Sequence, residues 1–345
     1  MSKIRVAFLS YPMLFQRQGG LQIQILETIS ELNKLGVKAE LINPNSDRLT
    51  DFDLIHVFSA ISGNYRLLEA AKGVAKPIVL SPLIQPDWTK YAGLRARFFE
   101  SLVGKITGWH IRTTYHEIET SLQLADALVA LGDIEKKSIM KAFLIPHEKI
   151  TVIPNGIPRR FFSAEPMLFT EKFGINPDFI LCVAAVNPYK NQLSLAKALE
   201  GTNYKLVLIG QCLVTDKGYL AEIQTYPHVV YLGSMDYSDP LLVSAYAAAK
   251  LFCLPSSSEV MPLCVLEALA AGTPVVMTKN HCMDMSLMKN VIKEIEPTKP
   301  EEIMASIIEL IAQNPSIDQC REVVSHLSWK SVAQEIHKIY LRLTN

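Results

Sequence analysis

Short runs of apolar residues alternate along the chain with longer stretches in which apolar residues recur every three or four positions. Runs of this length and β-branched content are typical of buried parallel strands, and the periodic stretches between them are typical of helices. The strand-like runs of the first half are 4–10, 38–43, 53–58, 77–81, 127–131 and 150–154. The alternation predicts repeated strand–helix–strand units, and therefore an α/β fold with parallel sheets.

A second alternating series begins after the turn pair Asn155-Gly156 and a looser stretch that follows it. Its strand-like runs are FILCVA, KLVLIG, HVVYLG, KLFCLP and TPVVM. With 345 residues the chain is long enough for two cores. We therefore predict a first domain over 1–160 and a second over 161–328. The last helical stretch has no strand after it, so we expect 329–345 to pack back on the first domain.

Composition excludes several classes of protein. Apolar residues make up 49% of the chain and charged residues 20%, which favours globular cores over disorder. Lys plus Arg and Asp plus Glu both total 34, so the chain has no excess positive charge that would indicate a nucleic-acid-binding protein. The start of the chain lacks the apolar region of a signal peptide, and no apolar run approaches the ~18 residues of a spanning helix, so we expect a cytoplasmic protein.

Cysteine and histidine spacing gives no sign of a metal site. The 6 cysteines are scattered without a CxxC pair, which favours reduced core thiols over disulfides or zinc ligands. His281, Cys282 and Asp284 lie close together in the sequence, but their spacing matches no recognised ligand set. We therefore expect them to line a loop.

The clearest candidate for a binding site lies within 251–276. There a strand is followed by a Ser-rich turn, by Pro262 at a predicted helix start and by Gly272 at the helix end. Helix N-termini after parallel strands are typical anion sites. Glu259 and Glu267 could accept hydrogen bonds from the hydroxyls of a sugar or ribose. Spacing alone favours a more ordinary interpretation, a solvated turn residue and an exposed helix residue.

The same segment, PSSSEVMPLCVLEALAAGTPVV, resembles the E-x7-E segment of retaining glycosyltransferases of the GT-B fold, specifically family four. Further pieces resemble that family in the same order: GGLQIQILETISELNKLGV, LADALVALGDIEKKSI, EKITVIPNGIPRRFF and SWKSVAQEIHKIYLRL. The loop after the first strand lacks the GxGxxG of a dinucleotide-binding dehydrogenase. The resemblance implies two Rossmann-like domains whose parallel sheets face each other across a cleft, the first for the acceptor and the second for a nucleotide-sugar donor.

The resemblance also implies roles for individual residues of the second domain. Glu267 would bind the ribose of the nucleotide, and Glu259 would sit beside the donor sugar and orient it. The backbone around Met261, Pro262 and Leu263 would support the sugar or the diphosphate.

Two further positions of the family pattern are matched only in part. Lys190 matches the lysine of a basic pair that neutralises the departing diphosphate, so with Glu259 it is our candidate for catalysis. Ala185 stands where the family usually has arginine. Losing that cation should weaken catalysis unless another residue replaces it.

The predicted first domain contributes a glycine pair and a histidine. Gly19 and Gly20 match the family's Gly-rich donor loop, although the pair fits a simple turn equally well on its residues alone. The family often has a histidine after the fourth strand, where this chain has Ser81-Pro82. His56 could face the same cleft and contact the acceptor, but a lone histidine at a strand end is more often structural.

One local segment, 88–112, bears on the acceptor. Its basic residues are interleaved with large apolar ones, and Glu100 is its only acid. Such a segment could dock on anionic lipid headgroups, at the inner face of the membrane, or be a packed helix with solvated charges. Both interpretations stay open. The basic residues are Lys90, Arg95, Arg97, Lys105 and Arg112.

Taken with these observations, the resemblance implies a retaining glycosyltransferase that moves a hexose-type sugar from a UDP-, GDP- or ADP-sugar to an acceptor hydroxyl. The acceptor would be a glycan or a lipid-linked molecule, in surface glycan or glycolipid synthesis. We expect no tightly bound cofactor, no essential metal and no nucleic-acid partner. The alternative, motivated by Ala185 and by the missing histidine after the fourth strand, is a catalytically weakened homologue that binds a nucleotide sugar and acts as a partner or scaffold subunit. A sugar-nucleotide epimerase, which would convert free donor without an acceptor, is a third hypothesis.

Overall fold

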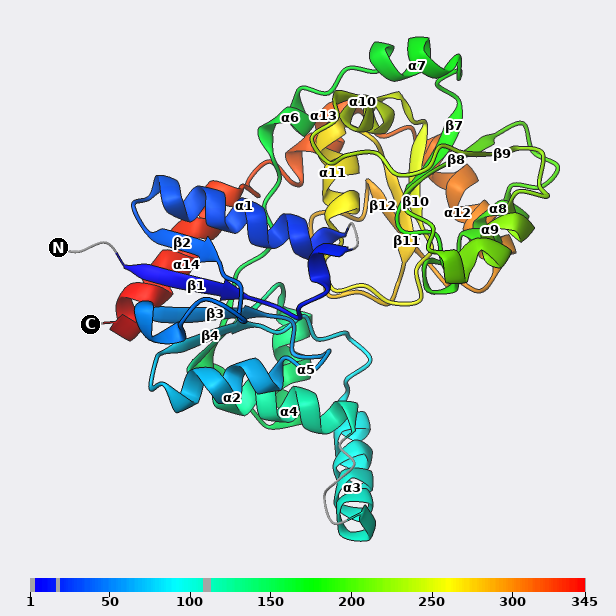
Figure 1. The fold of residues 1–345 in the computed structure, drawn as a ribbon. Helices are drawn as coiled ribbons and strands as arrows, with labels where there is room; N and C mark the ends of the chain where they lie inside the picture. Colours follow the sequence, from blue (N-terminus) through cyan, green and yellow to red (C-terminus); the bar gives the residue numbers. More distant parts are fainter. Residues whose placement is uncertain (1–3, 17–18, 108–112, 345) are drawn as a thin grey trace. The chain divides into compact units, whose positions relative to one another are not determined.

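The computed structural model describes residues 4–16, 19–107 and 113–344. The chain forms two compact α/β units, coloured along the sequence in Figure 1. The first contains strand β1, the stretch Leu21–Gly156 and the C-terminal helix, and the second contains Ile157–Ser328. The first boundary therefore falls after Gly156, where the sequence suggested 160. No helix among the described residues is both long enough and apolar enough to span a bilayer.

The first unit is built on a six-stranded parallel sheet with the order β2-β1-β3-β4-β5-β6. The strands are short, and the central strands β1, β3, β4 and β5 are largely buried, which explains why they appear in the sequence as continuous apolar runs. The strands are β1 (Arg5–Leu9), β2 (Lys38–Leu41), β3 (Leu54–Phe58), β4 (Ile78–Ser81), β5 (Ala127–Ala130) and β6 (Ile150–Val152).

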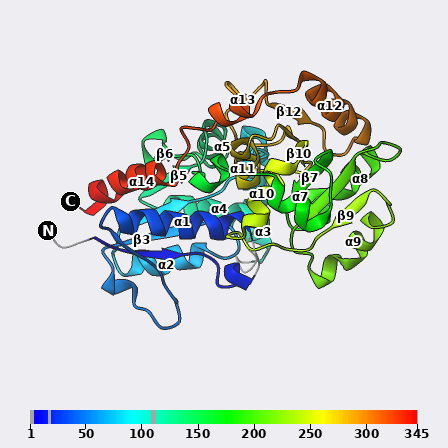
Figure 2. The same ribbon diagram turned by 90° about the horizontal axis from the view of Figure 1, so that it is seen from above.

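Helices cover both faces of this sheet. Ile55 and Val57 of β3 join a core that also holds buried residues of α2, α4 and α5, and alternation along the strand sends His56 to the opposite face, where α14 packs. Viewed from above, α1 and α14 lie over that second face (Figure 2). The helices are α1 (Gly20–Lys34), α2 (Tyr65–Gly73), α3 (Lys90–Thr107), α4 (Thr114–Leu124), α5 (Asp133–Phe143) and α14 (Trp329–Thr344), with short 3-10 turns η1 (Leu14–Gln16), η2 (Leu49–Asp51) and η3 (His147–Lys149).

The second unit repeats this architecture with the strand order β12-β11-β10-β7-β8-β9, again parallel. Its last strand, β12, was not among the strand-like runs found in the sequence. Lys293 and Glu294 interrupt the apolar pattern there, because only the ends of this edge strand are buried. The strands are β7 (Phe179–Val183), β8 (Lys205–Ile209), β9 (Val229–Tyr231), β10 (Leu251–Leu254), β11 (Val275–Thr278) and β12 (Ile292–Ile295).

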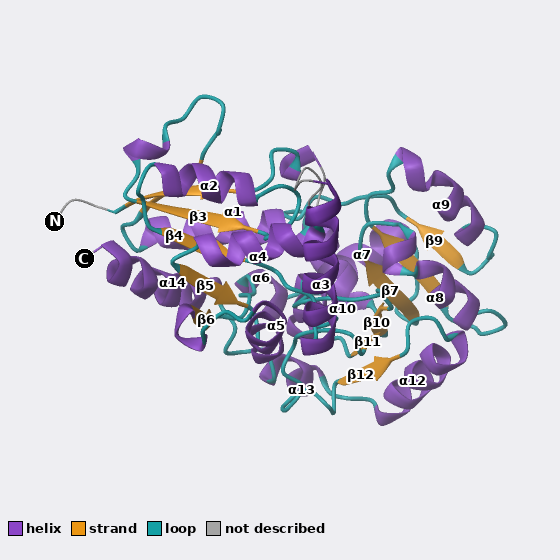
Figure 3. Ribbon diagram, turned by 90° about the horizontal axis from the view of Figure 1, so that it is seen from below, coloured by secondary structure: helices purple, strands orange, loops and turns teal. Residues whose placement is uncertain are grey.

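Helices also cover both faces of the second sheet (Figure 3). One core combines strand residues with buried residues of α8, α9 and α12. On the other face, Tyr246 of α10 packs against Phe252 of β10 with ring centroids 5.6 Å apart. The helices are α6 (Arg159–Phe162), α7 (Met167–Phe173), α8 (Gln192–Ala198), α9 (Lys217–Ile223), α10 (Pro240–Ala248), α11 (Leu263–Ala271), α12 (Pro300–Gln313) and α13 (Ile317–Glu322), with 3-10 turns η4 (Pro188–Lys190) and η5 (Val214–Asp216).

Each sheet has one point where the chain reverses the direction in which it adds strands. In the first sheet it lies between β1 and β3, because β2 was added on the other side of β1. In the second sheet it lies between β7 and β10. Loops that leave the carboxyl ends of the two strands at such a point diverge and leave a crevice for a ligand. The loops after β7 and β10 are therefore where a site in the second unit should lie.

Candidate functional site

The loops that leave β7 and β10 bring Lys190 and Glu259 together, although the two residues are 69 positions apart. Lys190 ends the turn η4 after β7, and its Nζ donates a hydrogen bond of 2.5 Å to Oε1 of Glu259 in the loop after β10. The side chains are 23% and 12% exposed, so the pair is largely shielded from water. Glu259 is thus not the solvated turn residue that its spacing alone favoured.

The charge state of Lys190 follows from this pairing. Burial alone would lower the pKa of the ammonium group. The negative charge of Glu259, with smaller contributions from Cys264, from the hydrogen bond itself and from Tyr189, outweighs burial, so the net pKa is raised. Lys190 therefore carries its positive charge at neutral pH, next to a carboxylate.

Hydrogen bonds to backbone groups hold the two loops together around this pair. The hydroxyl of Tyr189 donates to the carbonyl of Ser258 at 2.7 Å, and the amide of Ser257 donates to the carbonyl of Tyr189 at 2.8 Å. On the other side, the amide of Glu259 donates to the carbonyl of Asn280 at 2.9 Å. Neither Tyr189 nor Asn280 is predicted from the sequence, because no local pattern shows that the loops carrying them meet.

Glu267 lies in the middle of α11 and is buried, with 4% of its surface exposed. Its Oε2 accepts a hydrogen bond of 2.9 Å from the hydroxyl of Tyr246, which is also buried. Burial and then the charge of Glu267 raise the pKa of Tyr246 well above its ordinary value, so the hydroxyl keeps its proton and remains a donor. Glu267 is therefore not an exposed helix residue. Tyr246 was not predicted from the sequence either, although a tyrosine hydroxyl within the apolar stretch LLVSAYAA indicates a buried polar group that needs a partner.

The N-terminus of α11 completes this edge of the unit. Pro262 is the N-cap and the helix begins at Leu263, one residue later than the sequence suggested. The first amides of a helix have no acceptor within the helix, and the dipole places partial positive charge at that end. Met261 directly precedes Pro262, so the segment proposed to support a diphosphate does lead into a helix N-terminus.

Ala185 lies between β7 and η4, where related enzymes were expected to have arginine. Its carbonyl accepts a hydrogen bond of 2.9 Å from Nε2 of Gln192. The backbone just before it is tightly confined, because a Cβ built on Gly210 would lie 1.9 Å from the carbonyl oxygen of Ala184. Gly210 also has a φ of +155°, so glycine is required there for both reasons.

Gly19 and Gly20 occur at the start of α1, in the loop that leaves β1 at the reversal point of the first sheet. Both are exposed, and neither has a positive φ. Their backbone conformation therefore does not require glycine. A Cβ on Gly19 would meet nothing within 4 Å, which leaves its backbone open to close approach.

His56 does not fit the role of an acceptor contact. It lies inside β3 with no exposed surface, and both ring nitrogens are engaged: Nδ1 lies 2.6 Å from the hydroxyl of Tyr340 and Nε2 lies 3.0 Å from Oγ of Ser81. Burial lowers its pKa to about 3, so the ring is neutral. The prediction was wrong because the side chain faces α14, and its role is to join that helix to the sheet.

His281 also has a structural role. Its ring accepts a hydrogen bond of 3.0 Å from the amide of Met283 through Nδ1, and its Nε2 lies 3.1 Å from Oε1 of Glu294. Across 4–16, 19–107 and 113–344, no three His, Cys, Asp or Glu side chains cluster in a way that could hold a metal ion. The expectation that activity needs no metal remains a prediction.

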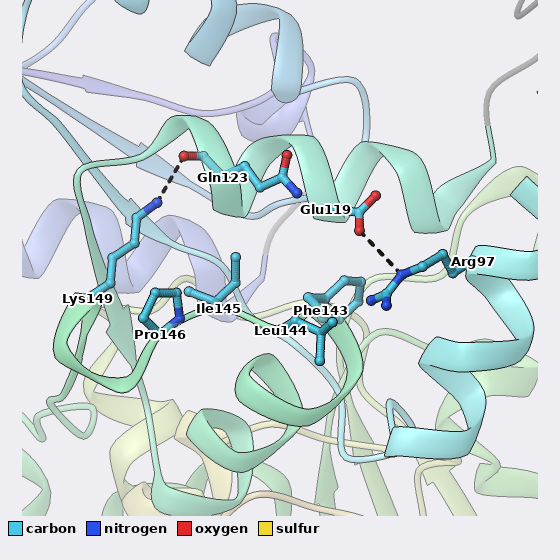
Figure 4. Close-up of a pocket in the computed structure, with 8 residues that line it drawn as sticks. All are labelled: Arg97, Glu119, Gln123, Phe143, Leu144, Ile145, Pro146 and Lys149. Carbon is cyan, nitrogen blue, oxygen red and sulfur yellow. Dashed lines mark hydrogen bonds and ion pairs between the residues drawn. The ribbon is translucent and has the colours of Figure 1, made fainter. Parts of the chain in front are cut away.

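A separate cavity of about 320 Å³ lies in the first unit (Figure 4). Its walls come from α3, α4 and the turn that leads into β6, so it lies near the amino ends of β5 and β6, away from the carboxyl ends. Its charged groups are used within the protein: Lys149 donates to the carbonyls of Leu122 and Gln123, and Arg97 donates to Tyr115. The Lys149 bonds cap the C-terminal end of α4, and the cavity is a poor match to a charged ligand because these cations already have partners.

A parallel α/β unit with a protected Lys–Glu pair, a buried carboxylate and a helix N-terminus at its strand ends has the features of a site for an anionic ligand rich in hydroxyls. Residues 168–324 match the family model described as "Glycosyl transferases group 1". The matched stretch contains Lys190, Glu259 and Glu267. The family resemblance found in the motifs is confirmed.

Two curated relatives show the degree of similarity. The chain is 28% identical over 229 residues to an uncharacterized glycosyltransferase of Methanocaldococcus jannaschii, covering 59% of this chain and 57% of that protein. It is 24% identical over 312 residues to the alpha-monoglucosyldiacylglycerol synthase of Acholeplasma laidlawii, covering 84% and 74%. The chain thus spans little more than half the length of the first relative.

The solved structure of Anabaena HepE in complex with UDP has the same fold. It aligns with a TM-score of 0.72 over 99% of this chain and 100% of that chain, at 18% identity. The same protein in complex with UDP-glucose aligns with a TM-score of 0.71 at 17% identity. With two parallel six-stranded sheets in this chain, these alignments confirm the predicted GT-B fold.

Proposed function

We propose that this chain is a retaining glycosyltransferase that moves a hexose-type sugar from a nucleoside-diphosphate sugar to an acceptor hydroxyl. The observation that carries the proposal is the Lys190–Glu259 pair at the reversal point of the second sheet. Its Glu259 lies on the same loop–helix segment as buried Glu267. Carboxylates accept hydrogen bonds from hydroxyls, and a lysine charge balances phosphate. A nucleotide sugar presents both kinds of group.

In this proposal each residue acts on one part of the donor. Glu267, oriented by Tyr246, accepts hydrogen bonds from the ribose hydroxyls. Lys190 balances the charge that develops on the departing diphosphate, and the N-terminus of α11 adds its dipole. Glu259 holds Lys190 through their hydrogen bond and orients the donor sugar. The leaving phosphate oxygen takes the acceptor's proton, so no separate protein base is required, and Gly19-Gly20 contributes backbone to the donor site.

The class of acceptor is supported by what related proteins use. The A. laidlawii relative is named for a glucosylated diacylglycerol, and an Escherichia coli relative, 25% identical over 234 residues, is an O-antigen chain mannosyltransferase. We propose that this chain likewise builds a surface glycan or a glycolipid. We propose UDP, GDP or ADP as the donor nucleotide, since these diphosphates share the ribose and diphosphate that the site would contact.

The test is sugar transfer from radiolabelled donors by the wild type and by Glu259→Gln. We expect transfer with one nucleotide sugar, retention of the anomeric configuration by NMR, no effect of a chelator, and at least a hundredfold lower rate in the variant. Glu309→Gln is the matched control, because Glu309 lies in the same unit and its side chain is 56% exposed. An unchanged rate in Glu259→Gln would remove Glu259 from the proposal, and inversion would exclude the retaining mechanism.

Ala185 favours a second candidate, a weakened homologue that binds a nucleotide sugar and serves as a partner subunit. With alanine there, Lys190 is the only cation of the expected basic pair. Binding of a nucleoside diphosphate in a thermal-shift assay, with neither transfer nor hydrolysis of the donor, would favour this function. Gain of donor hydrolysis or transfer in Ala185→Arg would then show that the missing cation is the cause.

A further inference from the structure

Helix α3 exposes its large apolar side chains. This helix projects from the body of the first unit (Figure 1). Tyr91 is 78% exposed, Phe98 68% and Ile106 75%. At 100° per residue the exposed large apolar residues fall within an arc of about 140°, so they form one face of the helix. The exposed cations Arg95 and Lys105 fall within the same arc. This apolar face of α3 consists of Tyr91, Leu94, Phe98, Phe99, Leu102 and Ile106.

The opposite face of α3, which packs on the protein, is made of small residues and one acid. Gly93, Glu100 and Gly104 are its buried residues. A Cβ built on Gly93 would lie 2.3 Å from the carbonyl oxygen of Ala142, so α3 contacts α5 through bare backbone. A helix that served only to pack would bury its large residues and expose its small ones. The apolar face of α3 is therefore not explained by the core of this unit.

The exposed charges of α3 are all positive. Lys90, Arg95 and Lys105 are exposed, and Arg97 is partly buried. The only acid, Glu100, is turned inward, where Oε2 accepts from the hydroxyl of Thr113 and Oε1 lies 3.5 Å from Nδ1 of His116. The long stems of lysine and arginine can lie along an apolar surface while their charges reach outward. The helix thus combines a wide apolar face with cations and no exposed acid.

We propose that the apolar face of α3 docks on the surface of an anionic lipid bilayer, with the helix lying in the plane of the headgroups. Exposed apolar patches of this kind mark interaction sites, and the positive charges match anionic lipid rather than an apolar protein surface. At 18 residues the helix is about 27 Å long, enough to lie along the headgroups. This proposal rests on α3 alone and is independent of the proposed transfer reaction.

The docking surface is smaller than the segment 88–112 that the sequence suggested. Trp88 belongs to the core, where its ring lies 5.1 Å from that of Phe143. Arg97 donates to the hydroxyl of Tyr115 and to the carbonyl of Ala142. Arg112 and its neighbours 108–111 lie outside the described residues. The structure assigns the surface to exposed residues within Lys90–Thr107.

Flotation of the full chain with lipid vesicles tests the proposal. We expect binding to vesicles of phosphatidylcholine with phosphatidylglycerol, weaker binding in high salt, and little binding to phosphatidylcholine alone. Arg95→Glu/Lys105→Glu should lower partitioning at least about 25-fold, because each cation near an anionic surface contributes about fivefold. Leu94→Ser/Phe98→Ser should lower it at least about tenfold by removing apolar area.

Matched controls come from the same unit. Lys137→Glu/Lys330→Glu changes two exposed lysines on α5 and α14, and Leu26→Ser/Leu341→Ser changes two exposed leucines on α1 and α14. Both control variants should keep at least about half of the wild-type partitioning to vesicles. Circular dichroism checks that every variant is folded.

Three outcomes would overturn the proposal. These are equal binding to neutral and anionic vesicles, wild-type binding by the folded α3 variants, or no vesicle binding at all. Analytical ultracentrifugation identifies the other possible occupant: a dimer that Leu94→Ser/Phe98→Ser dissociates would assign the face to a second copy of the chain. Transfer to a water-soluble acceptor should be unchanged in the α3 variants, so failure of docking and failure of the proposed activity are distinguishable.

Discussion

The Lys190–Glu259 pair makes a quantitative prediction about the stability of the second unit. Lys190→Met keeps most of the aliphatic stem and removes the charge, leaving a carboxylate that is only 12% exposed. At 2.5 Å and an effective dielectric constant of about 20, the attraction is roughly 6–7 kcal/mol before desolvation is subtracted. Desolvation offsets much of it, and removing one partner of a fully buried pair costs about 3–5 kcal/mol. Because both side chains keep some exposure, we expect a loss of about 2–3 kcal/mol.

A double-mutant cycle isolates the pairwise part of this loss. We expect Glu259→Gln to cost about 1–2 kcal/mol and the double variant to cost less than the sum of the two, with a coupling of about 1–2 kcal/mol. The surface pair Lys293–Glu309, at 2.8 Å in the same unit with side chains 26% and 56% exposed, is the matched control. Its coupling should stay below about 1 kcal/mol.

Urea unfolding is the assay, with two probes. Far-UV circular dichroism follows the unfolding of both units. Tryptophan fluorescence follows the first unit, because the chain's 3 tryptophans, Trp88, Trp109 and Trp329, all belong to it. Strictly additive effects of Lys190→Met and Glu259→Gln, or a coupling no larger than that of the surface pair, would refute the claim that the two charges depend on each other.

Three further predictions concern single residues. The pKa of His56 is about 3 in the folded state and 6.5 in the unfolded state, so the free energy of unfolding falls as the pH drops through this range. We expect this contribution to be a loss of about 2 kcal/mol by pH 5, measured by urea unfolding, and to be absent in His56→Gln. Gly210→Ala should cost at least about 2 kcal/mol in the same assay, because it combines a disfavoured φ with a clash on Ala184. Tyr246→Phe should cost about 1–2 kcal/mol and weaken nucleoside-diphosphate binding severalfold in a titration, because Glu267 loses its buried donor.

Each of these has a result that would contradict it. His147→Gln, at an exposed position, is the control for pH dependence, and an equal acid response of the His56 variant and the wild type would argue against the buried neutral ring. Wild-type stability of Gly210→Ala would mean that the loop relaxes without cost. Full nucleotide affinity in Tyr246→Phe would separate the hydroxyl from any role in orienting Glu267.

Much of the fold follows from sequence pattern because parallel strands buried on both faces produce continuous apolar runs. The pattern fails where burial is incomplete, as at β12, whose centre is formed by Lys293 and Glu294. The candidate site residues Glu259 and Glu267 were recognised from a local motif. Their burial was not, because it depends on α10 and on the loop after β7, which are far away in the sequence.

The less successful predictions also depend on distant contacts. His56 is bonded by Tyr340, which lies 284 positions away, so no local pattern could show that its ring faces a helix. For α3, periodicity gave an apolar stripe but not its direction. Gly93 and Gly104 set that direction, because the absence of their side chains lets the face on which they lie pack against the protein, so that the apolar face points outward.

The most direct test of the central claim is calorimetric titration of UDP, GDP and ADP into the wild type and Glu267→Gln. Glutamine keeps the shape and an acceptor for Tyr246, so the fold should survive while the charge is lost. We predict that one diphosphate binds the wild type and that the variant binds it at least about tenfold more weakly, or about 1.4 kcal/mol, while exposed Glu309→Gln binds normally. No binding of any diphosphate, or equal binding by the folded Glu267 variant, would contradict a donor site at α11.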